Sequence, residues 1–133
     1  MEIIFSIVGG TITYLLFGYL VFEIILGKFT KNRTLQLKGF NKSDKDSSIA
    51  YLILSCAAYA ILITFILYNW QSMLSTVNAF IVSGIIGSLI AIMVNTYLYS
   101  TTHFYNNLTP LIVDVLAAFI TVGVLGTVVS IVL

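Results

Sequence analysis

The chain has 133 residues, of which 59% are hydrophobic and 8% charged, with a formal net charge of +1. A soluble domain carries roughly a quarter charged residues, so this composition excludes an ordinary soluble globule and predicts a chain whose partner is the lipid bilayer. The near-neutral balance lacks the basic excess that neutralises phosphates, which excludes a nucleic-acid-binding protein.

Four apolar stretches follow one another along the chain, at about residues 3–27, 48–69, 77–99 and 110–132. Each is close to the ~20 residues that a helix needs to cross ~30 Å of hydrocarbon. Strands of a membrane barrel would instead alternate polar and apolar residues. The sequence therefore predicts an all-α, polytopic membrane protein, a single domain over residues 1–133 with four transmembrane helices.

All Lys and Arg residues lie in the segment between the first two spans, residues 28–47. They are Lys28, Lys31, Arg33, Lys38, Lys42 and Lys45. Basic residues beside membrane spans stay in the cytoplasm, so we expect this loop inside and both termini outside. Because no basic n-region precedes Lys28, we expect the first span to be retained and not cleaved as a signal peptide.

The basic loop has two interpretations. It determines topology and touches anionic headgroups at about 1 kcal/mol for each basic residue, or it also docks a cytoplasmic partner.

Small residues recur four apart in the third and fourth spans. The pairs are Ser83 with Gly87, Gly84 with Ser88, Gly123 with Thr127, and Gly126 with Ser130. Such positions let helix backbones approach closely in lipid, so these two spans are predicted to be packing surfaces. The partner is either another helix of the same chain, a second copy in a homo-oligomer, or another membrane subunit.

An internal repeat is indicated when residues 5–32 are laid on residues 80–107 without a gap. The identities are Phe5 on Phe80, Gly9 on Gly84, Phe29 on Phe104, and Asn32 on Asn107. In addition, Asp46 and Asp114 each lie near the start of an Ala-containing helix. Two tandem helical hairpins related by an axis along the membrane normal are the predicted arrangement.

Three features of the chain bear on its family. They are its overall length, a polar residue before an Ala-rich helix in each repeat, and the run from Tyr14 to Glu23 that leads into Gly27-Lys-Phe-Thr30. In these features the chain resembles the YjfL-like family. That family comprises small bacterial inner-membrane proteins of unknown function, built from two tandem transmembrane hairpins. The resemblance covers nearly the whole chain and implies an inner-membrane location without implying an activity.

A candidate intramembrane polar site consists of Glu23, Asn95, His103 and Asp114. Glu23 and Asp114 should lie at a similar, cytoplasmic depth, where a carboxylate in hydrocarbon is costly and calls for a reason. Facing the bundle interior, this cluster would take up a proton or a cation. Alternatively, Glu23 pairs with Lys28 at the interface, while Asp114 caps the fourth helix or accepts hydrogen bonds from Thr109 or a neighbouring helix.

Other chemistry has no support in the sequence. One cysteine, Cys56, and one histidine cannot supply a thiolate or imidazole metal cluster, and Cys56 is expected to be a small buried hydrophobe. No catalytic triad, phosphate-binding loop or paired-carboxylate motif is present. We therefore expect no enzyme activity, no cofactor and no metal site.

Two functional hypotheses remain. The first is a structural or accessory membrane subunit that acts by helix packing and through its basic cytoplasmic loop. The second is a small oligomeric transporter or channel, linked to protons or cations, that uses Asp114 and Glu23. The side to which Asp114 points distinguishes them, since an inward carboxylate beside Asn95 and Glu23 favours transport and a position at the lipid interface favours the structural hypothesis.

Overall fold

The computed structural model describes residues 1–26, 49–70, 74–102 and 107–133, and these residues are helical almost throughout. The elements are α1 (Glu2–Tyr19), its continuation η1, a π-helix (Leu20–Ile25), α3 (Ile49–Asn69), α4 (Thr76–Thr101) and α5 (Leu108–Val132). All four spans, counting α1 and η1 as one, are long and apolar enough to cross a membrane. The predicted all-α fold with four transmembrane helices is confirmed, and each helix ends within one or two residues of its expected position.

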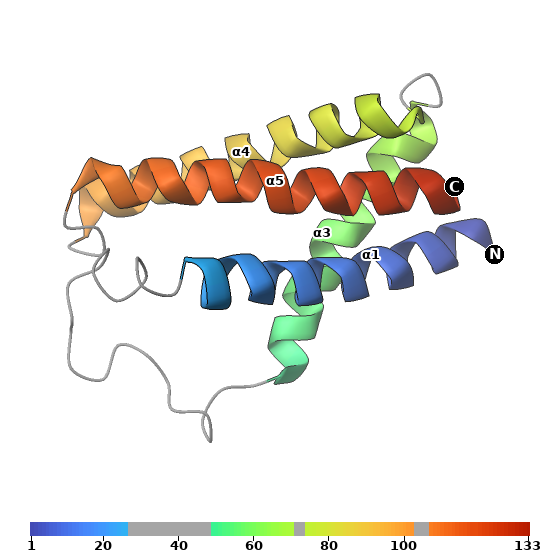
Figure 1. Ribbon diagram of the computed structural model, residues 1–133, viewed down its shortest axis with the longest axis horizontal. Helices are drawn as coiled ribbons and strands as arrows, with labels where there is room; N and C mark the ends of the chain where they lie inside the picture. The colour runs from blue at the N-terminus through green and yellow to red at the C-terminus, as the bar shows by residue number, and fades with distance from the viewer. Residues whose placement is uncertain (27–48, 71–73, 103–106) are drawn as a thin grey trace.

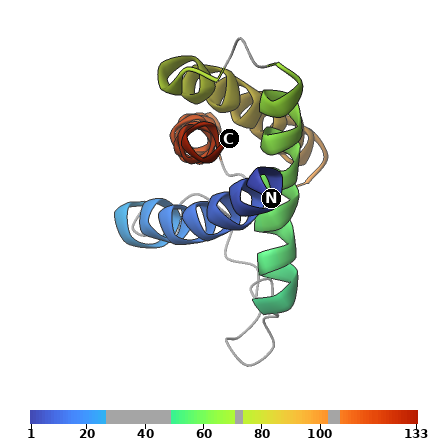
Figure 2. The same cartoon turned by 90° about the vertical axis from the view of Figure 1, so that its right-hand side faces the viewer.

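The predicted cytoplasmic loop, residues 28–47, lies outside the described residues, and so do its six basic side chains. Both termini lie at one end of the molecule (Figures 1 and 2), as an even number of membrane crossings requires.

Side-chain caps mark where α4 and α5 begin. The Ser75 hydroxyl accepts a hydrogen bond from the backbone N–H of Asn78 at 3.4 Å. The Asn107 side chain accepts from the Thr109 N–H at 3.1 Å. These short polar side chains satisfy donors that have no partner within the helix. The interpretation of Asp114 as the cap of the fourth helix is wrong, because α5 begins at Leu108 and leaves Asp114 well inside it.

Helix α5 is the centre of the fold and packs against α4, α1 and α3. Figure 2, which looks along α5, shows the other three helices around it. The core combines its inward residues Val122, Leu125 and Val129 with residues from α3 and α4 such as Ile63 and Ala79. Large apolar side chains are exposed on all four spans, as contact with lipid favours.

Helices α4 and α5 form a hairpin packed closely along its length. A Cβ atom added to Gly87 would lie 2.5 Å from Val122 Cγ2 and 3.0 Å from the Ala118 carbonyl oxygen. Gly126 faces Ser83 in the same way. The prediction that small residues make these two helices packing surfaces is confirmed, and their partners belong to the same chain.

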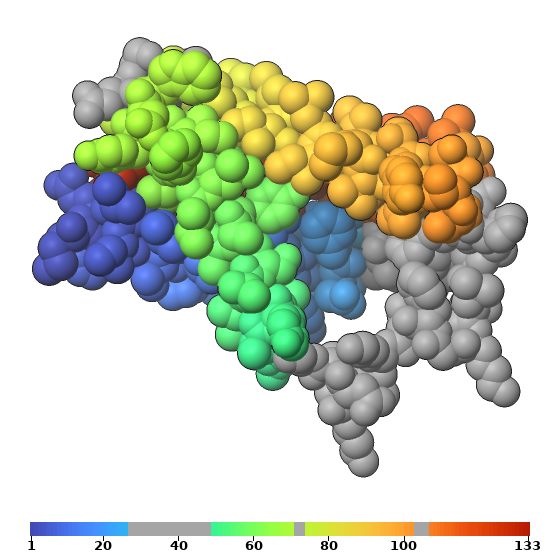
Figure 3. Space-filling view, turned by 180° about the vertical axis from the view of Figure 1, so that it is seen from behind, coloured from blue at the N-terminus to red at the C-terminus, as the bar shows by residue number. Residues whose placement is uncertain are grey.

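The first hairpin is built differently, because α3 crosses the other helices at a steep angle (Figures 1 and 2). The crossing centres on Gly10, where an added Cβ would lie 3.2 Å from Ala60 Cβ and 3.1 Å from Leu125 Cδ1. The buried residues of α3 lie between Cys56 and Leu67. Its first turns project from the body (Figure 3). The two hairpins thus differ in packing, and the internal repeat stays a prediction.

Candidate functional site

Asp114 points into the bundle and not toward lipid. Its side chain is 8% exposed and lies on the inner face of α5. Asn95, half-buried on α4, lines the same hollow. Asp114 is six residues from the start of α5 and Asn95 six residues from the end of α4, so each lies ~9 Å from that end of the hairpin. The antiparallel hairpin therefore brings an acid and an amide to one depth.

The hollow that they share, here called the Asp114 hollow, has a volume of about 250 Å³. It is lined by Tyr14, Phe22, Tyr59, Ile90, Ala91, Val94, Asn95, Asp114 and Ala118. All four spans contribute to it. Its polar groups are the carboxylate, the amide and the two tyrosine hydroxyls, and the rest of the wall is aliphatic or aromatic.

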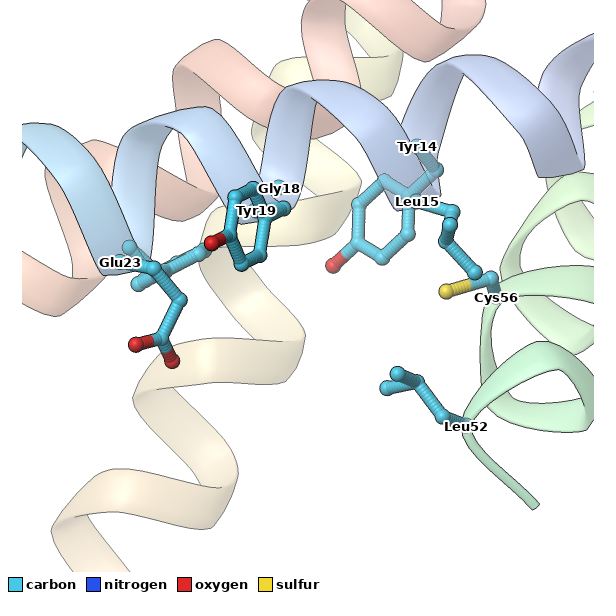
Figure 4. Close-up of a pocket in the computed structure, with 8 residues that line it drawn as sticks. Tyr14, Leu15, Gly18, Tyr19, Glu23, Leu52 and Cys56 are labelled. Carbon is cyan, nitrogen blue, oxygen red and sulfur yellow. The ribbon is translucent and has the colours of Figure 1, made fainter. Parts of the chain in front are cut away.

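Glu23 lines a neighbouring hollow of about 240 Å³ between the first span and α3, here called the Glu23 hollow. Its lining consists of Tyr14, Leu15, Gly18, Tyr19, Phe22, Glu23, Leu52 and Cys56 (Figure 4). The Glu23 side chain is exposed, unlike that of Asp114. The structure therefore places the two acids in adjacent hollows and does not join them in one cluster.

Tyr14 and Phe22 line both hollows and so form the wall between them. The η1 segment that carries Phe22 and Glu23 also contacts α5. This contact agrees with the expectation that Glu23 and Asp114 lie at similar depths.

The π-helical turn of η1 was not foreseen from the sequence. Its wider winding is visible in the backbone, where the Leu26 N–H donates to the Val21 carbonyl at 2.9 Å, one residue farther back than in an α-helix. A π-helical turn rotates the residues that follow it relative to the preceding helix, and such turns are frequent at functional sites. Here the affected residues include Phe22 and Glu23, which line the two hollows.

Tyr14 and Tyr59 also belong to the site, although no role in it was predicted for them. Their rings stack with centroids 5.0 Å apart and planes at 27°. The Tyr14 hydroxyl lies beside that of Thr121 on α5, and the Thr121 hydroxyl donates to the Ala117 carbonyl at 2.9 Å. A signal was available, because a tyrosine far from the ends of an apolar span needs a partner for its hydroxyl. Such residues mark polar interiors.

The remaining candidates are quickly placed. His103 lies outside the described residues. Cys56 is buried on α3 and lines the Glu23 hollow. In the part of the chain that the structure describes, no three His, Cys, Asp or Glu side chains group together as metal ligands would.

Comparison with known proteins yields no relative: no family model, curated protein or solved structure matches the chain significantly.

Proposed function

We propose that the protein is a small membrane transporter or channel, linked to protons or cations, whose central group is the Asp114 carboxylate. The observation that carries the proposal is the inward position of Asp114, in a hollow that Asn95 shares. An ionised acid costs roughly 2.5 to 3.5 kcal/mol or more at the centre of a span, and Asp114, buried six residues inside α5, bears part of that cost. A chain that needs only to pack helices would avoid this cost with an apolar residue.

The other residues of the site have roles that follow from their chemistry. The Asn95 amide lines the same hollow, and its N–H groups are of the kind that lower the cost of a charged carboxylate when they donate to it. Glu23, exposed beside the Glu23 hollow, is placed to attract cations at the membrane surface. Cations that reach Glu23 then have Asp114 in the adjacent hollow as their next acceptor.

Reconstitution into liposomes tests this function. We expect the wild type to move protons or monovalent cations down an imposed gradient, read by a trapped pH dye or a cation-sensitive dye. Asp114→Asn should lose this flux, because the isosteric amide carries no charge. Glu2→Gln is the matched control: it also removes one acid, but Glu2 is exposed at the start of α1. Absence of flux in the wild type, or equal flux in Asp114→Asn, contradicts the proposal.

We also propose the topology: a bacterial inner membrane, both termini outside and the segment of residues 28–47 in the cytoplasm. The asymmetric charge supports it, since every Lys and Arg lies between residues 28 and 45. Trypsin, which cuts after Lys and Arg, can therefore cleave this chain only there. We expect cleavage in inverted vesicles and protection in intact spheroplasts. The opposite pattern would show that the chain has the opposite orientation.

Membership of the YjfL-like family remains a proposal, and it rests on the residues that resemble that family.

A second candidate function is that of an accessory subunit. It is favoured by the first turns of α3, where Tyr51, Leu52 and Leu54 are exposed and no described helix covers them. In this case a partner membrane protein would copurify in mild detergent, and reversing the charges of the basic loop would release it. If the chain purifies without a partner, and if cells that carry the charge-reversed loop behave like the wild type, the accessory role is contradicted.

A further inference from the structure

Charge is distributed unevenly in the described spans. They contain Glu2, Glu23 and Asp114 but no Lys or Arg, since all six basic residues lie between positions 28 and 45. Two of these three acids line the two hollows. The interior of the described bundle is therefore suited to a positively charged occupant.

The wall between the hollows is aromatic. Tyr14 and Phe22 line both hollows, and Tyr59 stacks on Tyr14 at the side of the Asp114 hollow. Figure 4 shows the Tyr14 and Tyr19 rings on the same side of α1, with the Glu23 carboxylate beyond them. Aromatic faces attract cations, and the attraction is larger where water is excluded.

Size and lining distinguish among the positively charged occupants. A proton needs no hollow of about 250 Å³. A bare divalent cation such as Ca²⁺ needs about six to eight oxygen ligands, whereas most of this lining is aliphatic or aromatic. A lipid chain would use the apolar wall but gain nothing from the carboxylate. An organic cation uses both, with its charge at the acid and its apolar groups on the rings.

We propose that the Asp114 hollow binds an organic cation of the aryl- or alkylammonium class, with Asp114 as counter-ion and Tyr14, Tyr59 and Phe22 as the aromatic wall. This rests on the proposed function, since it names the substrate class of the same site. The cation approaches the Asp114 hollow through the Glu23 hollow, which lies on the other side of the shared wall, between the first span and α3. Asn95 adds a neutral amide to the lining of the same hollow and does not itself hold the charge.

Binding of benzyltrimethylammonium to the full chain in lipid nanodiscs, measured by equilibrium dialysis with radiolabelled ligand, tests this assignment. Neopentylbenzene, its uncharged isostere, competes for the apolar wall alone. We expect saturable binding of the cation that a similar concentration of the isostere does not displace. Asp114→Asn should weaken binding roughly 30-fold or more, because the counter-ion is lost.

The aromatic wall is tested by a pair of variants at one position. Tyr59→Phe keeps the ring and should bind within about twofold of the wild type. Tyr59→Leu keeps bulk but removes the ring, and should weaken binding roughly 5- to 30-fold. Tyr51→Leu makes the same change on an exposed residue of α3 that lines neither hollow, and should have no effect. Normal elution in size-exclusion chromatography shows that each variant is folded.

The outcomes separate this inference from the proposed function. Flux that depends on Asp114, together with equal binding of the cation and its isostere, overturns the organic-cation assignment and leaves proton or inorganic-cation transport standing. Charge-selective binding without flux supports the assignment and contradicts transport. Equal affinities of Tyr59→Phe and Tyr59→Leu overturn the aromatic wall.

Discussion

Gly126 is the position where a single methyl group should do most harm. A Cβ added there would run into the Ser83 side chain and would lie 2.7 Å from the Ala79 carbonyl oxygen. The Ser83 hydroxyl could rotate away, but the Ser83 Cβ and the Ala79 carbonyl are fixed to the backbone of α4, so the two helices must move apart. Overpacking of this kind costs about 1 to 3 kcal/mol, and a fixed obstacle places Gly126→Ala near the upper end.

Helix propensity opposes this cost, because alanine is favoured over glycine by up to about 1 kcal/mol in a helix interior. The net loss for Gly126→Ala is then about 2 kcal/mol, or a shift of roughly 30-fold in the ratio of folded to unfolded protein. Gly18→Ala is the matched control. It makes the same change in α1, where an added Cβ meets nothing within 4 Å, so it should be neutral or slightly stabilising.

The measurement is unfolding by SDS in mixed micelles, followed by pulse proteolysis. We expect Gly126→Ala to unfold at a lower SDS mole fraction than the wild type, and Gly18→Ala to unfold at the same or a higher one. If the two variants unfold together, the close packing of α4 on α5 through Gly126 is refuted.

Three further predictions concern stability in the same assay. Asn107→Ala should cost about 1 kcal/mol, since it removes the cap of α5, and Asn107→Asp should restore most of that loss; an unchanged midpoint would argue against capping. Leu125→Ala should cost about 2 to 5 kcal/mol because this side chain is fully buried, whereas Leu116→Ala, 60% exposed on the same helix, should cost little; equal losses would reverse the assignment of the inner face. Ser88→Ala should cost about 0.6 kcal/mol by removing the bond to the Val115 carbonyl across the hairpin, and a loss above about 2 kcal/mol would show that Ser88 has a larger role.

Hydropathy alone predicted the four spans, because a chain in lipid must satisfy its backbone within helices of about 20 apolar residues. Pairs of small residues four apart predicted the close approach of α4 and α5, since few arrangements other than helix contact use this spacing. The pairs are Ser83 with Gly87, Gly84 with Ser88, Gly123 with Thr127, and Gly126 with Ser130. Asp114 was predicted to be a site residue because acidic residues are rare within the apolar spans. An acid among apolar residues is conspicuous wherever it points.

Other features could not be predicted, for a common physical reason. In lipid, the inner and outer faces of a span are both apolar, so periodicity does not say which face packs or at what angle. The steep crossing of α3 at Gly10 and Ala60 therefore had no signal in the hydropathy pattern. Neither did the stack of Tyr14 on Tyr59, which joins residues from two spans.

The site was predicted in part. Asp114 and Asn95 do line one hollow, whereas Glu23 lines the next one, because the π-helical turn and the tilt of α3 place Phe22 and Tyr14 between the two acids. Local winding of this kind depends on tertiary packing and leaves no mark in residue spacing. His103 lies outside the described residues, so its inclusion stays a prediction.

The central claim is that position 114 faces a water-accessible hollow and not lipid, and thiol labelling tests it most directly. Asp114→Cys and Leu116→Cys, each in a Cys56→Ser background, would be treated in proteoliposomes with methanethiosulfonate ethylammonium, which reacts with thiolates that water can reach. We predict rapid labelling at 114 and little at 116. Rapid labelling at 116 with none at 114 would contradict the account.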